Sequence, residues 1–448
     1  MAAHTTDRGA GRRTGTGQKG PINRVSEKRH KHLRALFGSN ALVNLVYLAT
    51  FLAMGWLLDA VEFGAFRVAQ AYLSIAVSLA MLGLNTALTH QFPLFTPSQR
   101  ASAWIWTRRA LLMTSLCTGI SVYALTPSVA RDGGPVQELL YLLSFPAAVA
   151  GASLCNARLS IYQAQGDLIG YARLQAQWKS IVFLFGLTGG LLLQAQTALI
   201  AMAMAYVAVY VLQRLRAPVP THATEIEKSA APEVLAPLFR SGMWPFASIC
   251  VSAIYSNVEF LYVDTDDLSS GTAGAYSLAS LIFIGGAALL MPFQTYAGSL
   301  VVNRRIELVG LLRLQLACLG AVCLTALLGL GIAYGLTFVY PTKFNAIFFE
   351  FAILVCVKLG LWGSYAVIGS VLNFLEKGME AFLLTVICLV GLGLGWLLVG
   401  GINSLREMVM LQIASNVVLL VGSMYLVVDG YRSQSMRRVE TKKLRDQE

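Results

Sequence analysis

Charge is scarce in this sequence of 448 residues. Only 13 % of the residues are charged, whereas 56 % are apolar, and the mean hydropathy is +0.63. Soluble domains carry about 25 % charged residues, roughly twice this share. The composition therefore excludes an ordinary soluble protein and predicts a chain that lies mostly within a membrane.

Motifs for nucleotide, metal and disulfide chemistry are absent from the sequence. No glycine-rich phosphate loop occurs, and the seven cysteines lack the C-x-x-C spacing and fall within or beside apolar segments. The five histidines, at positions 4, 30, 32, 90 and 222, lie in tails or polar connections and form no metal-ligand set. The connections expected on the outer side are too short for a large polar active site. We therefore expect no cofactor, no metal and no enzymatic activity.

The apolar residues are grouped in stretches that are long enough to cross a membrane as helices. A helix needs about 20 apolar residues to span the roughly 30 Å hydrocarbon core. The stretches lie near residues 36–58, 64–88, 110–126, 139–160, 175–194, 197–213, 243–263, 273–302, 311–335, 345–372, 380–400 and 406–428. This pattern predicts an all-α polytopic membrane protein with about 12 transmembrane helices.

A polar segment with several prolines, residues 214–241, divides the apolar stretches into two groups of six. We interpret it as a cytoplasmic linker between an N-lobe at 35–213 and a C-lobe at 242–428. A disordered basic tail is expected at 1–34, and a second basic tail at 429–448.

The two halves share a short sequence pattern at equivalent positions. The segment Gly64-Ala65-Phe66-Arg67-Val68-Ala69 opens the second stretch, and Gly274-Ala275-Tyr276-Ser277-Leu278-Ala279 opens the eighth. A duplication with an even number of helices in each half relates the two lobes by an axis along the membrane normal. The pattern therefore favours two similar lobes.

The net charge of +11 is distributed unevenly along the chain. If the N-terminus lies inside, fourteen basic residues fall on inner connections, and only Arg67, Arg131, Lys343 and Arg406 fall on outer ones. This asymmetry follows the positive-inside rule. The basic residues then indicate how the chain is oriented in the membrane and attract anionic lipid. No nucleic-acid partner is expected. The sequence predicts a multi-pass protein of the inner (plasma) membrane with both termini in the cytoplasm.

A polar stripe in the stretch 243–263 includes an acidic residue. Serines and tyrosines recur there at spacings of three and four, together with Glu259, and Asn257 lies beside them. Contact between helices explains the serines but not the acid, because a charge at the centre of a membrane helix costs roughly 2.5–3.5 kcal/mol. We expect the stripe to line a cavity, with Glu259, Asn257 and Glu350 as candidates for ion or proton coupling.

Lys358 is the most deeply placed charge in the sequence. Two interpretations stay open for it: an ion pair with Glu259 or Glu350, or a cationic anchor for an anionic substrate. Trp362 and Tyr365 extend the same helix face toward the inner side. The other candidate residues of a substrate pathway lie near the inner ends of their helices, where the two asparagines can instead join neighbouring helices: Arg313, Gln294, Asn40 and Asn44.

Several segments resemble a family of membrane proteins. Residues 36–47, 62–66 and 84–89, together with 163–167 and the 274–277 turn, are similar to the polysaccharide-transport flippases that move O-antigen and other lipid-linked oligosaccharides. These belong to the multidrug/oligosaccharidyl-lipid/polysaccharide exporter superfamily. The resemblance extends from about residue 34 to residue 428.

The resemblance implies two six-helix lobes around a central V-shaped cavity. It also implies alternating access that moves a polyprenyl-diphosphate-linked oligosaccharide to the outer leaflet for cell-surface polysaccharide biosynthesis, including lipopolysaccharide. Lys358 and Arg313 match the cationic role toward the diphosphate. The implied partners are the lipid-linked oligosaccharide, membrane lipid and cytoplasmic glycan-assembly enzymes.

Three alternatives to a flippase stay open at the level of the sequence. One is a cation-coupled multidrug exporter of the same superfamily, which would favour several acids in a lobe cavity. The second is a structural scaffold that uses its basic tails to recruit cytoplasmic enzymes. The third, from a different class, is a membrane-embedded glycan polymerase or acyltransferase. Long outer loops with His, Arg or Asp clusters are typical of such enzymes, and this sequence lacks them.

Overall fold

Polar side chains fix several of the helix starts in this protein. The first N–H groups of a helix have no partner within the helix, so a side-chain oxygen just before the helix stabilises them. Asp59 Oδ1 accepts from the Glu62 N–H at 2.7 Å, and Asp167 Oδ1 accepts from the Gly170 N–H at 2.8 Å. Asn345 Oδ1 accepts in the same way at 3.0 Å, so that three of the membrane helices begin at a capping residue.

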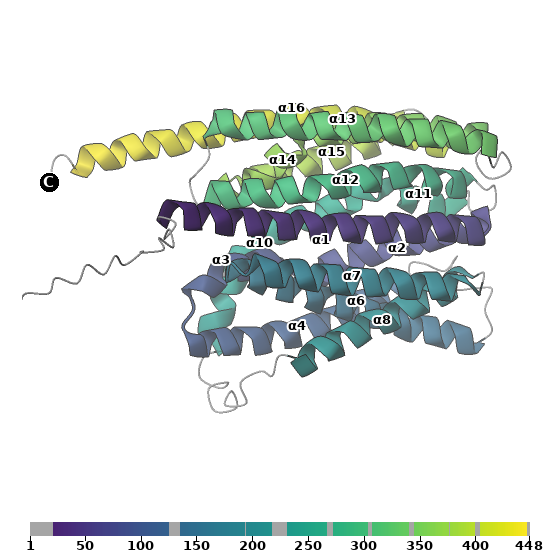
Figure 1. Ribbon diagram of the computed structural model, residues 1–448, viewed down its shortest axis with the longest axis horizontal. Coiled ribbons are helices and arrows are strands. Elements are labelled where there is room, and N and C mark those ends of the chain that lie inside the picture. Colours follow the sequence, from purple (N-terminus) through teal and green to yellow (C-terminus); the bar gives the residue numbers. More distant parts are fainter. Residues whose placement is uncertain are drawn as a thin grey trace, which may run out of the picture.

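A computed structural model describes residues 21–124, 135–192, 194–216, 231–266, 272–302, 307–339, 345–375, 377–398 and 404–445. All regular structure in these ranges is helical, and the helices lie nearly parallel to one another (Figure 1). The predicted all-α polytopic architecture, with two six-helix lobes around a central cavity, is confirmed.

Six long helices form the first lobe, and α3 (Leu84–Gln91) with the short η1 (Phe92–Leu94) connects the second of them to the third. The long helices are α1 (Pro21–Leu57), α2 (Ala60–Ala80), α4 (Pro97–Ala124), α6 (Pro135–Ala164), α7 (Leu168–Gly190) and α8 (Ala195–Arg216).

The second lobe begins with a broken span and continues with five unbroken helices. Its elements are α10 (Ala231–Ser256), α11 (Val258–Asp266), α12 (Thr272–Val302), α13 (Leu308–Val339), α14 (Ala346–Val371), η3 (Leu372–Leu375), α15 (Gly378–Leu398) and α16 (Leu405–Arg445).

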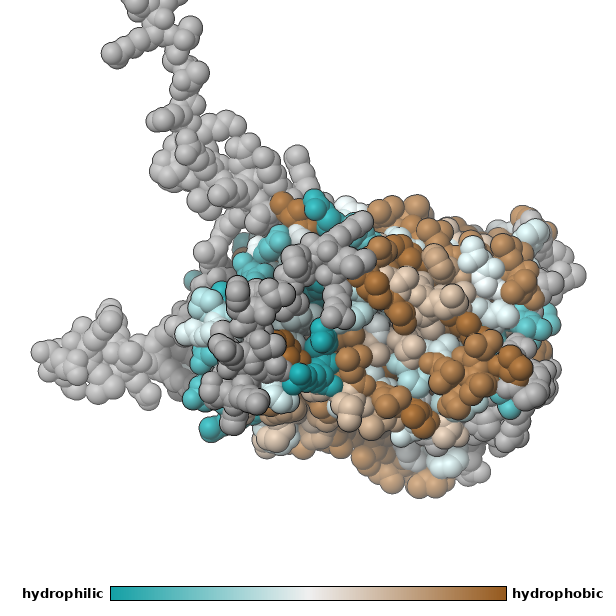
Figure 2. Space-filling view, turned by 90° about the horizontal axis from the view of Figure 1, so that it is seen from below, coloured by the Kyte–Doolittle hydropathy of each residue, from teal (hydrophilic) through white to brown (hydrophobic). Residues whose placement is uncertain are grey.

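The outer surface of the helix bundle is apolar, as a membrane requires. Within the described ranges, nine helices are long and apolar enough to cross a membrane. On α13, Leu324, Leu327 and Leu328 are each 59–68 % exposed, a pattern that is unfavourable in water. Figure 2 shows hydrophobic side chains over the middle of one face, while hydrophilic side chains gather at one end of it.

Three predicted boundaries differ from the structure because helices continue into polar sequence. Helix α1 starts at Pro21, so the second half of the tail predicted to be disordered is helical. Helix α10 starts at Ala231, inside the predicted linker, of which 217–230 lies outside the described residues. Helix α16 runs on to Arg445 through the predicted second tail. Lys, Arg, Glu and Gln are good helix formers, and extending an existing helix is far easier than starting one.

The second predicted span, 64–88, is broken in the structure. Leu82 and Gly83 have φ values of 47° and 70°, and α3 starts immediately afterwards. A Cβ atom on Gly83 would lie 2.2 Å from the Gly242 carbonyl oxygen of α10. Glycine is therefore needed here both for the positive φ and for the close approach of the two lobes.

The equivalent segments of the two halves pack against each other at one end of the molecule, which we call the outer end, following the expected orientation. A Cβ atom on Gly274 of α12 would lie 2.4 Å from the Ala60 carbonyl oxygen of α2. Gly64 of α2 is also close to Ala273, since a Cβ atom there would lie 3.3 Å from the Ala273 Cβ. A contact between equivalent segments is what a two-fold axis between similar lobes produces.

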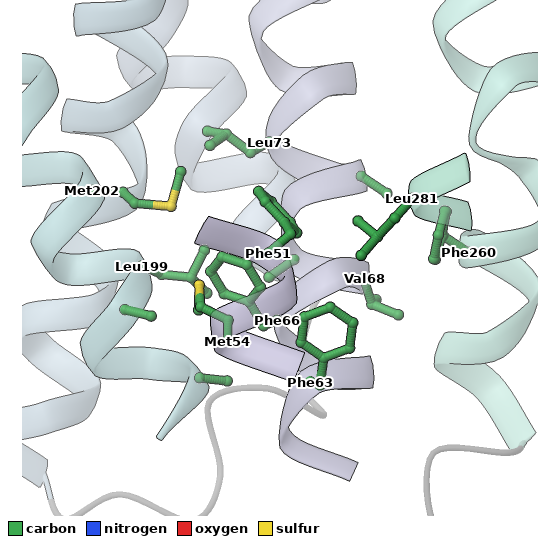
Figure 3. Packing of buried hydrophobic residues seen from close by; sticks show 14 of the residues in the cluster. Phe51, Met54, Phe63, Phe66, Val68, Leu73, Leu199, Met202, Phe260 and Leu281 are labelled. Atoms are coloured by element: carbon green, nitrogen blue, oxygen red, sulfur yellow. The ribbon is translucent and has the colours of Figure 1, made fainter. Parts of the chain in front are cut away.

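A hydrophobic cluster continues from the first lobe into the second. Phe51 of α1 packs against Phe66 of α2 with ring centroids 5.8 Å apart, and both side chains are fully buried. Figure 3 shows this core beside Phe260 of α11 and Leu281 of α12, which belong to the same cluster. The outer halves of the lobes therefore share one core, and the candidate site lies next to it.

Candidate functional site

A cavity of about 560 Å³ lies between the two lobes. Its walls come from α1, α2, α6, α7 and α8 of the first lobe and from α10, α11, α12 and α14 of the second. Binding sites for drug-sized ligands have volumes of roughly 300–1,000 Å³. The cavity is therefore large enough for the polar part of a small ligand.

The second-lobe wall of the cavity contains a buried ion pair. The Lys358 ammonium of α14 donates to Glu259 Oε1 of α11, and the Tyr276 hydroxyl of α12 donates to the same oxygen at 2.6 Å. Lys358 is 6 % exposed and Glu259 1 % exposed. The Lys358 ammonium also lies 5.0 Å from the centre of the Phe283 ring. Two charges this far from water are stable only together.

The break between α10 and α11 places Glu259 at the cavity. Asn257 interrupts the helix, and its side-chain amide donates to the Ala253 carbonyl at 2.7 Å. Asparagine competes in this way with the backbone bonds of a helix and favours helix ends. Glu259 then lies in the first turn of α11, where its negative charge is favoured by the helix dipole.

Arg67 of α2 is the second cation of the cavity, and its hydrogen-bond partners are neutral. Its Nη1 donates to the Tyr47 hydroxyl at 3.1 Å and to Gln70 Oε1 at 2.9 Å, while Nη2 is 3.4 Å from Ser280 Oγ of the second lobe. The guanidinium also lies 5.1 and 5.2 Å from the ring centres of Phe51 and Phe260. Arg67 is only 7 % exposed and has no carboxylate partner among the described residues.

Three buried polar atoms of cavity-lining residues lack hydrogen-bond partners within the described part of the chain. They are Arg67 Nε, Trp178 Nε1 and Glu259 Oε2. A buried polar atom without a partner costs about 1–3 kcal/mol, and more when the group is charged. A ligand with both acceptor and donor groups could satisfy these atoms, so the arrangement favours binding.

The structure brings three of the predicted site residues to the cavity, namely Lys358, Glu259 and Asn257. Glu350 lies elsewhere, since its Oε1 is 2.8 Å from Arg406 Nη2 and both side chains are about half exposed. The Lys358 ion pair is thus made with Glu259 and not with Glu350.

None of the remaining predicted pathway residues whose side chains the structure describes lines the cavity. Gln294 Nε2 donates to the Ala366 carbonyl at 3.1 Å, and the Tyr365 hydroxyl donates to Asn416 Oδ1 at 2.8 Å, so both join helices within the second lobe. Trp362 packs on Phe283, with ring centroids 5.4 Å apart. Arg313 is exposed on α13, Asn44 is partly exposed on α1, and the Asn40 side chain lies outside the described part of the structure.

Sequence reasoning missed Arg67. It was assigned to an outer connection, which is wrong because α2 begins at Ala60 and places Arg67 about 10 Å along the helix. The signal was available, since Arg67 falls inside the predicted span 64–88 and within the segment that recurs in the second half. A charge in such a position is a candidate functional residue by default.

No protein-family model matches the sequence, and no curated protein matches it. Solved structures do match. An outward-facing multidrug resistance MATE family transporter of the MOP superfamily superposes with a TM-score of 0.60 at 16 % identity, covering 92 % of this chain and 96 % of that chain. The chain has the fold of these transporters.

Two further structures support the same fold. A MATE transporter from Vibrio cholerae matches with a TM-score of 0.61 at 15 % identity, covering 92 % of this chain and 98 % of that one. A MOP superfamily transporter from Pyrococcus furiosus matches with a TM-score of 0.58 at 14 % identity, covering 91 % of this chain and 95 % of that chain. That transporter is described as having a binding pocket of reverse polarity, which suggests a different function. At these identities the likeness is one of fold.

Proposed function

We propose that this protein is an alternating-access transporter of the inner membrane that moves an anionic, lipid-linked substrate, a polyprenyl-diphosphate-linked oligosaccharide, to the outer leaflet. The observation that carries the proposal is Arg67, a buried guanidinium that lines the central cavity and is paired only with neutral groups. A guanidinium binds phosphate oxygens through two parallel N–H groups, and this geometry suits a diphosphate.

The charge of the cavity supports an anionic substrate. Its lining contains two cations, Arg67 and Lys358, and one acid, Glu259, so the formal charge of the lining is two minus one, or +1. Glu259 is already paired with Lys358. A cationic ligand would find Glu259 as the acid of this lining, and that acid is already paired. An anionic ligand can bind Arg67 and compete with Glu259 for Lys358.

The position of Arg67 also supports a transport cycle. Its guanidinium belongs to the first lobe and contacts Ser280 and Phe260 of the second. When the lobes separate, these contacts break, and the strength with which Arg67 binds a ligand changes with them. A ligand drives alternating access only if it binds the two states with different strength.

The second candidate is cation-coupled multidrug export. The fold favours it, because the matching structures include multidrug resistance MATE transporters. The acid that a cationic drug or a coupling ion needs would be Glu259, after Lys358 has moved away. The positive formal charge of the cavity lining argues against multidrug export. The Pyrococcus furiosus transporter is a case in which this fold is described with a pocket of reverse polarity.

Transport by the purified protein in liposomes tests both candidates. We expect a fluorescent polyprenyl-diphosphate disaccharide to cross the bilayer, and the cationic dye ethidium not to be concentrated. Arg67→Gln should abolish lipid movement, and Arg67→Lys should retain part of it, since the charge remains but the two-pronged geometry is lost. The matched control is Arg313→Gln, because Arg313 is exposed and lies outside the cavity. Ethidium transport without lipid movement would instead establish the multidrug candidate.

A further inference from the structure

One wall of the cavity is neutral and rich in aromatic and amide groups. It is formed by three helices of the first lobe, which contribute Asn156 from α6, Trp178 from α7 and Tyr206 from α8. This first-lobe wall faces the same space as Arg67 and Lys358, and its three side chains carry no formal charge. It takes no part in the ion pair or in the contacts of the guanidinium.

Trp178 is the centre of the first-lobe wall. Its side chain is only 5 % exposed, and its ring lies 5.6 Å from the Tyr206 ring at an angle of 45°. The indole Nε1–H is buried without a hydrogen-bond partner among the described residues. An indole N–H in such a place ordinarily finds an acceptor, and leaving it unpaired is costly. The missing acceptor points to a ligand.

Close packing of the backbone fixes the position of Tyr206. A Cβ atom on Gly151 of α6 would lie 2.6 Å from the Tyr206 Cβ, so only glycine permits this approach of α6 and α8. The Trp178–Tyr206 pair therefore has a defined place in the wall to which Asn156 also belongs. A pre-formed wall of this kind binds without the cost of ordering its side chains.

The chemistry of the first-lobe wall matches a neutral sugar ring. A pyranose has an apolar face of C–H groups, which packs on an aromatic ring, and an edge of hydroxyls, which exchange hydrogen bonds with an indole N–H, a phenol and an amide. A purely apolar ligand would leave Trp178 Nε1 unpaired. The three side chains of the wall carry no charge, and Lys179, whose ammonium lies 5.7 Å from the centre of the Trp178 ring, is not among the residues that line the cavity. The lining groups of this wall therefore favour a hydroxyl-bearing, uncharged ligand.

Gln70 links the cationic part of the cavity to α8, which contributes Tyr206 to the first-lobe wall. Gln70 of α2 accepts from Arg67 at 2.9 Å, and its amide nitrogen lies 3.7 Å from the Met202 sulfur of α8, which also lines the cavity. A ligand with a charged group next to a sugar would span the two regions. A diphosphate with its first sugar has this form.

We propose that Trp178, Tyr206 and Asn156 form a saccharide subsite, which receives a sugar ring of a substrate whose diphosphate is bound by Arg67 and Lys358. This inference rests on the function proposed above and adds the part of the cavity that recognises the sugar. It predicts that the sugar contributes to binding separately from the diphosphate.

The subsite can be tested with two substrate analogues that have a short isoprenoid chain. Their binding is measured on the full-length protein in detergent. The probes are farnesyl diphosphate and farnesyl diphosphate carrying one glucose, with the Kd measured by isothermal titration calorimetry. Wild type should bind the glucose-bearing probe about tenfold more tightly, a difference of the size expected for one aromatic contact. Trp178→Leu should abolish that difference and leave the Kd for farnesyl diphosphate within about twofold, since Arg67 and Lys358 are unchanged.

The control variants separate the subsite from general effects on folding. Trp244→Leu removes a tryptophan that packs on Phe382, 6.0 Å away, outside the cavity, and should leave both Kd values unchanged. Asn156→Leu is the second test variant, and should weaken only the glucose-bearing probe. Equal binding of the two probes by wild type, or equal weakening of both by Trp178→Leu and Asn156→Leu, would overturn the subsite while leaving the diphosphate site. Binding of neither probe would overturn both proposals.

Discussion

The two cations of the cavity, Lys358 and Arg67, have different kinds of partner. Lys358 is neutralised by Glu259 within the second lobe, whereas Arg67 is surrounded by a phenol, an amide, a hydroxyl and two aromatic rings. The ion pair can remain intact while the lobes move, because both partners belong to one lobe. The environment of Arg67 depends on both lobes. The surroundings of Arg67 would therefore change if the two lobes moved relative to each other.

The buried ion pair makes a prediction about stability. Lys358→Met alone leaves the Glu259 charge buried without its partner, and breaking such a pair costs about 3–5 kcal/mol. Adding Glu259→Gln should restore most of the loss, because the remaining groups are neutral and similar in size. Thermal unfolding in detergent of wild type, the two single variants and the double variant measures this coupling.

The exposed pair between Glu350 and Arg406 is the matched control. Its side chains are 45 % and 55 % exposed, and such pairs contribute at most about 1 kcal/mol. Glu350→Gln should therefore change the unfolding temperature very little. A loss as large as that of Lys358→Met would mean that the method responds to any removed charge and not to burial.

At the scale of helices and turns, the junction of α2 and α3 is the most constrained element. Gly83 combines a φ of 70° with a position at which a Cβ atom would meet the Gly242 carbonyl at 2.2 Å. Gly166 has nearly the same φ, 72°, but nothing lies within 4 Å of the added atom. The two glycines therefore share a positive φ but differ in what surrounds them.

Alanine substitution at these two glycines separates two free-energy costs. One is the cost of backbone strain, and the other is the cost of disturbing the contact between the lobes. Gly166→Ala should cost about 1–2 kcal/mol, the ordinary penalty of a left-handed backbone. Gly83→Ala should cost a further 1–3 kcal/mol or so, because the backbones of α3 and α10 must move apart. Thermal unfolding of the two variants measures the difference, and equal losses would show that the contact at Gly83 adds nothing.

The sequence predicted the elements better than their junctions. Apolar runs of about 20 residues were sufficient to locate the membrane helices, because the hydrocarbon core sets their length. The break at Leu82–Gly83 depends on a contact with Gly242, a residue far away in the chain, which no local pattern reveals. The helical extension of α16 was missed because polar residues signal a tail as readily as they signal an exposed helix.

The candidate site was predictable only in part for a similar reason. Glu259 and Lys358 stand out as charges within apolar stretches, and their pairing was one of the two open interpretations. Tyr365 and Gln294 share that polar appearance, but their partners are Asn416 and the Ala366 carbonyl within one lobe. Periodicity identifies the face of a helix, and only the tertiary structure shows whether that face meets the cavity or another helix.

At the scale of the whole molecule, the outer contact between the lobes provides a test of alternating access. An added Cβ atom at Gly64 lies 3.3 Å from the Ala273 Cβ, close to the 3.5–4.5 Å of a disulfide. Gly64→Cys with Ala273→Cys, in a background without the native cysteines, should form a disulfide that stops transport. Reduction should restore it, as measured in the liposome assay.

A disulfide within one lobe is the control for this experiment. An added Cβ atom at Gly363 lies 3.1 Å from the Val322 Cβ, and both residues belong to the second lobe. Gly363→Cys with Val322→Cys should leave transport unchanged if the lobes move as rigid bodies. Full transport by the oxidised Gly64–Ala273 pair would mean that the outer contact does not open during the cycle.

Helix α16 is long enough to turn a small movement of the second lobe into a larger movement at its end. Its 41 residues make a rod of about 62 Å, twice the roughly 30 Å that the membrane core requires. Figure 1 shows its end projecting beyond the other helices. Lys377 Nζ lies 2.7 Å from Asp429 Oδ2, and this ion pair joins α16 to the segment before α15 in the second lobe. A small tilt of that lobe within the membrane would therefore become a much larger sweep at the tip, where a single fluorescent label can follow it.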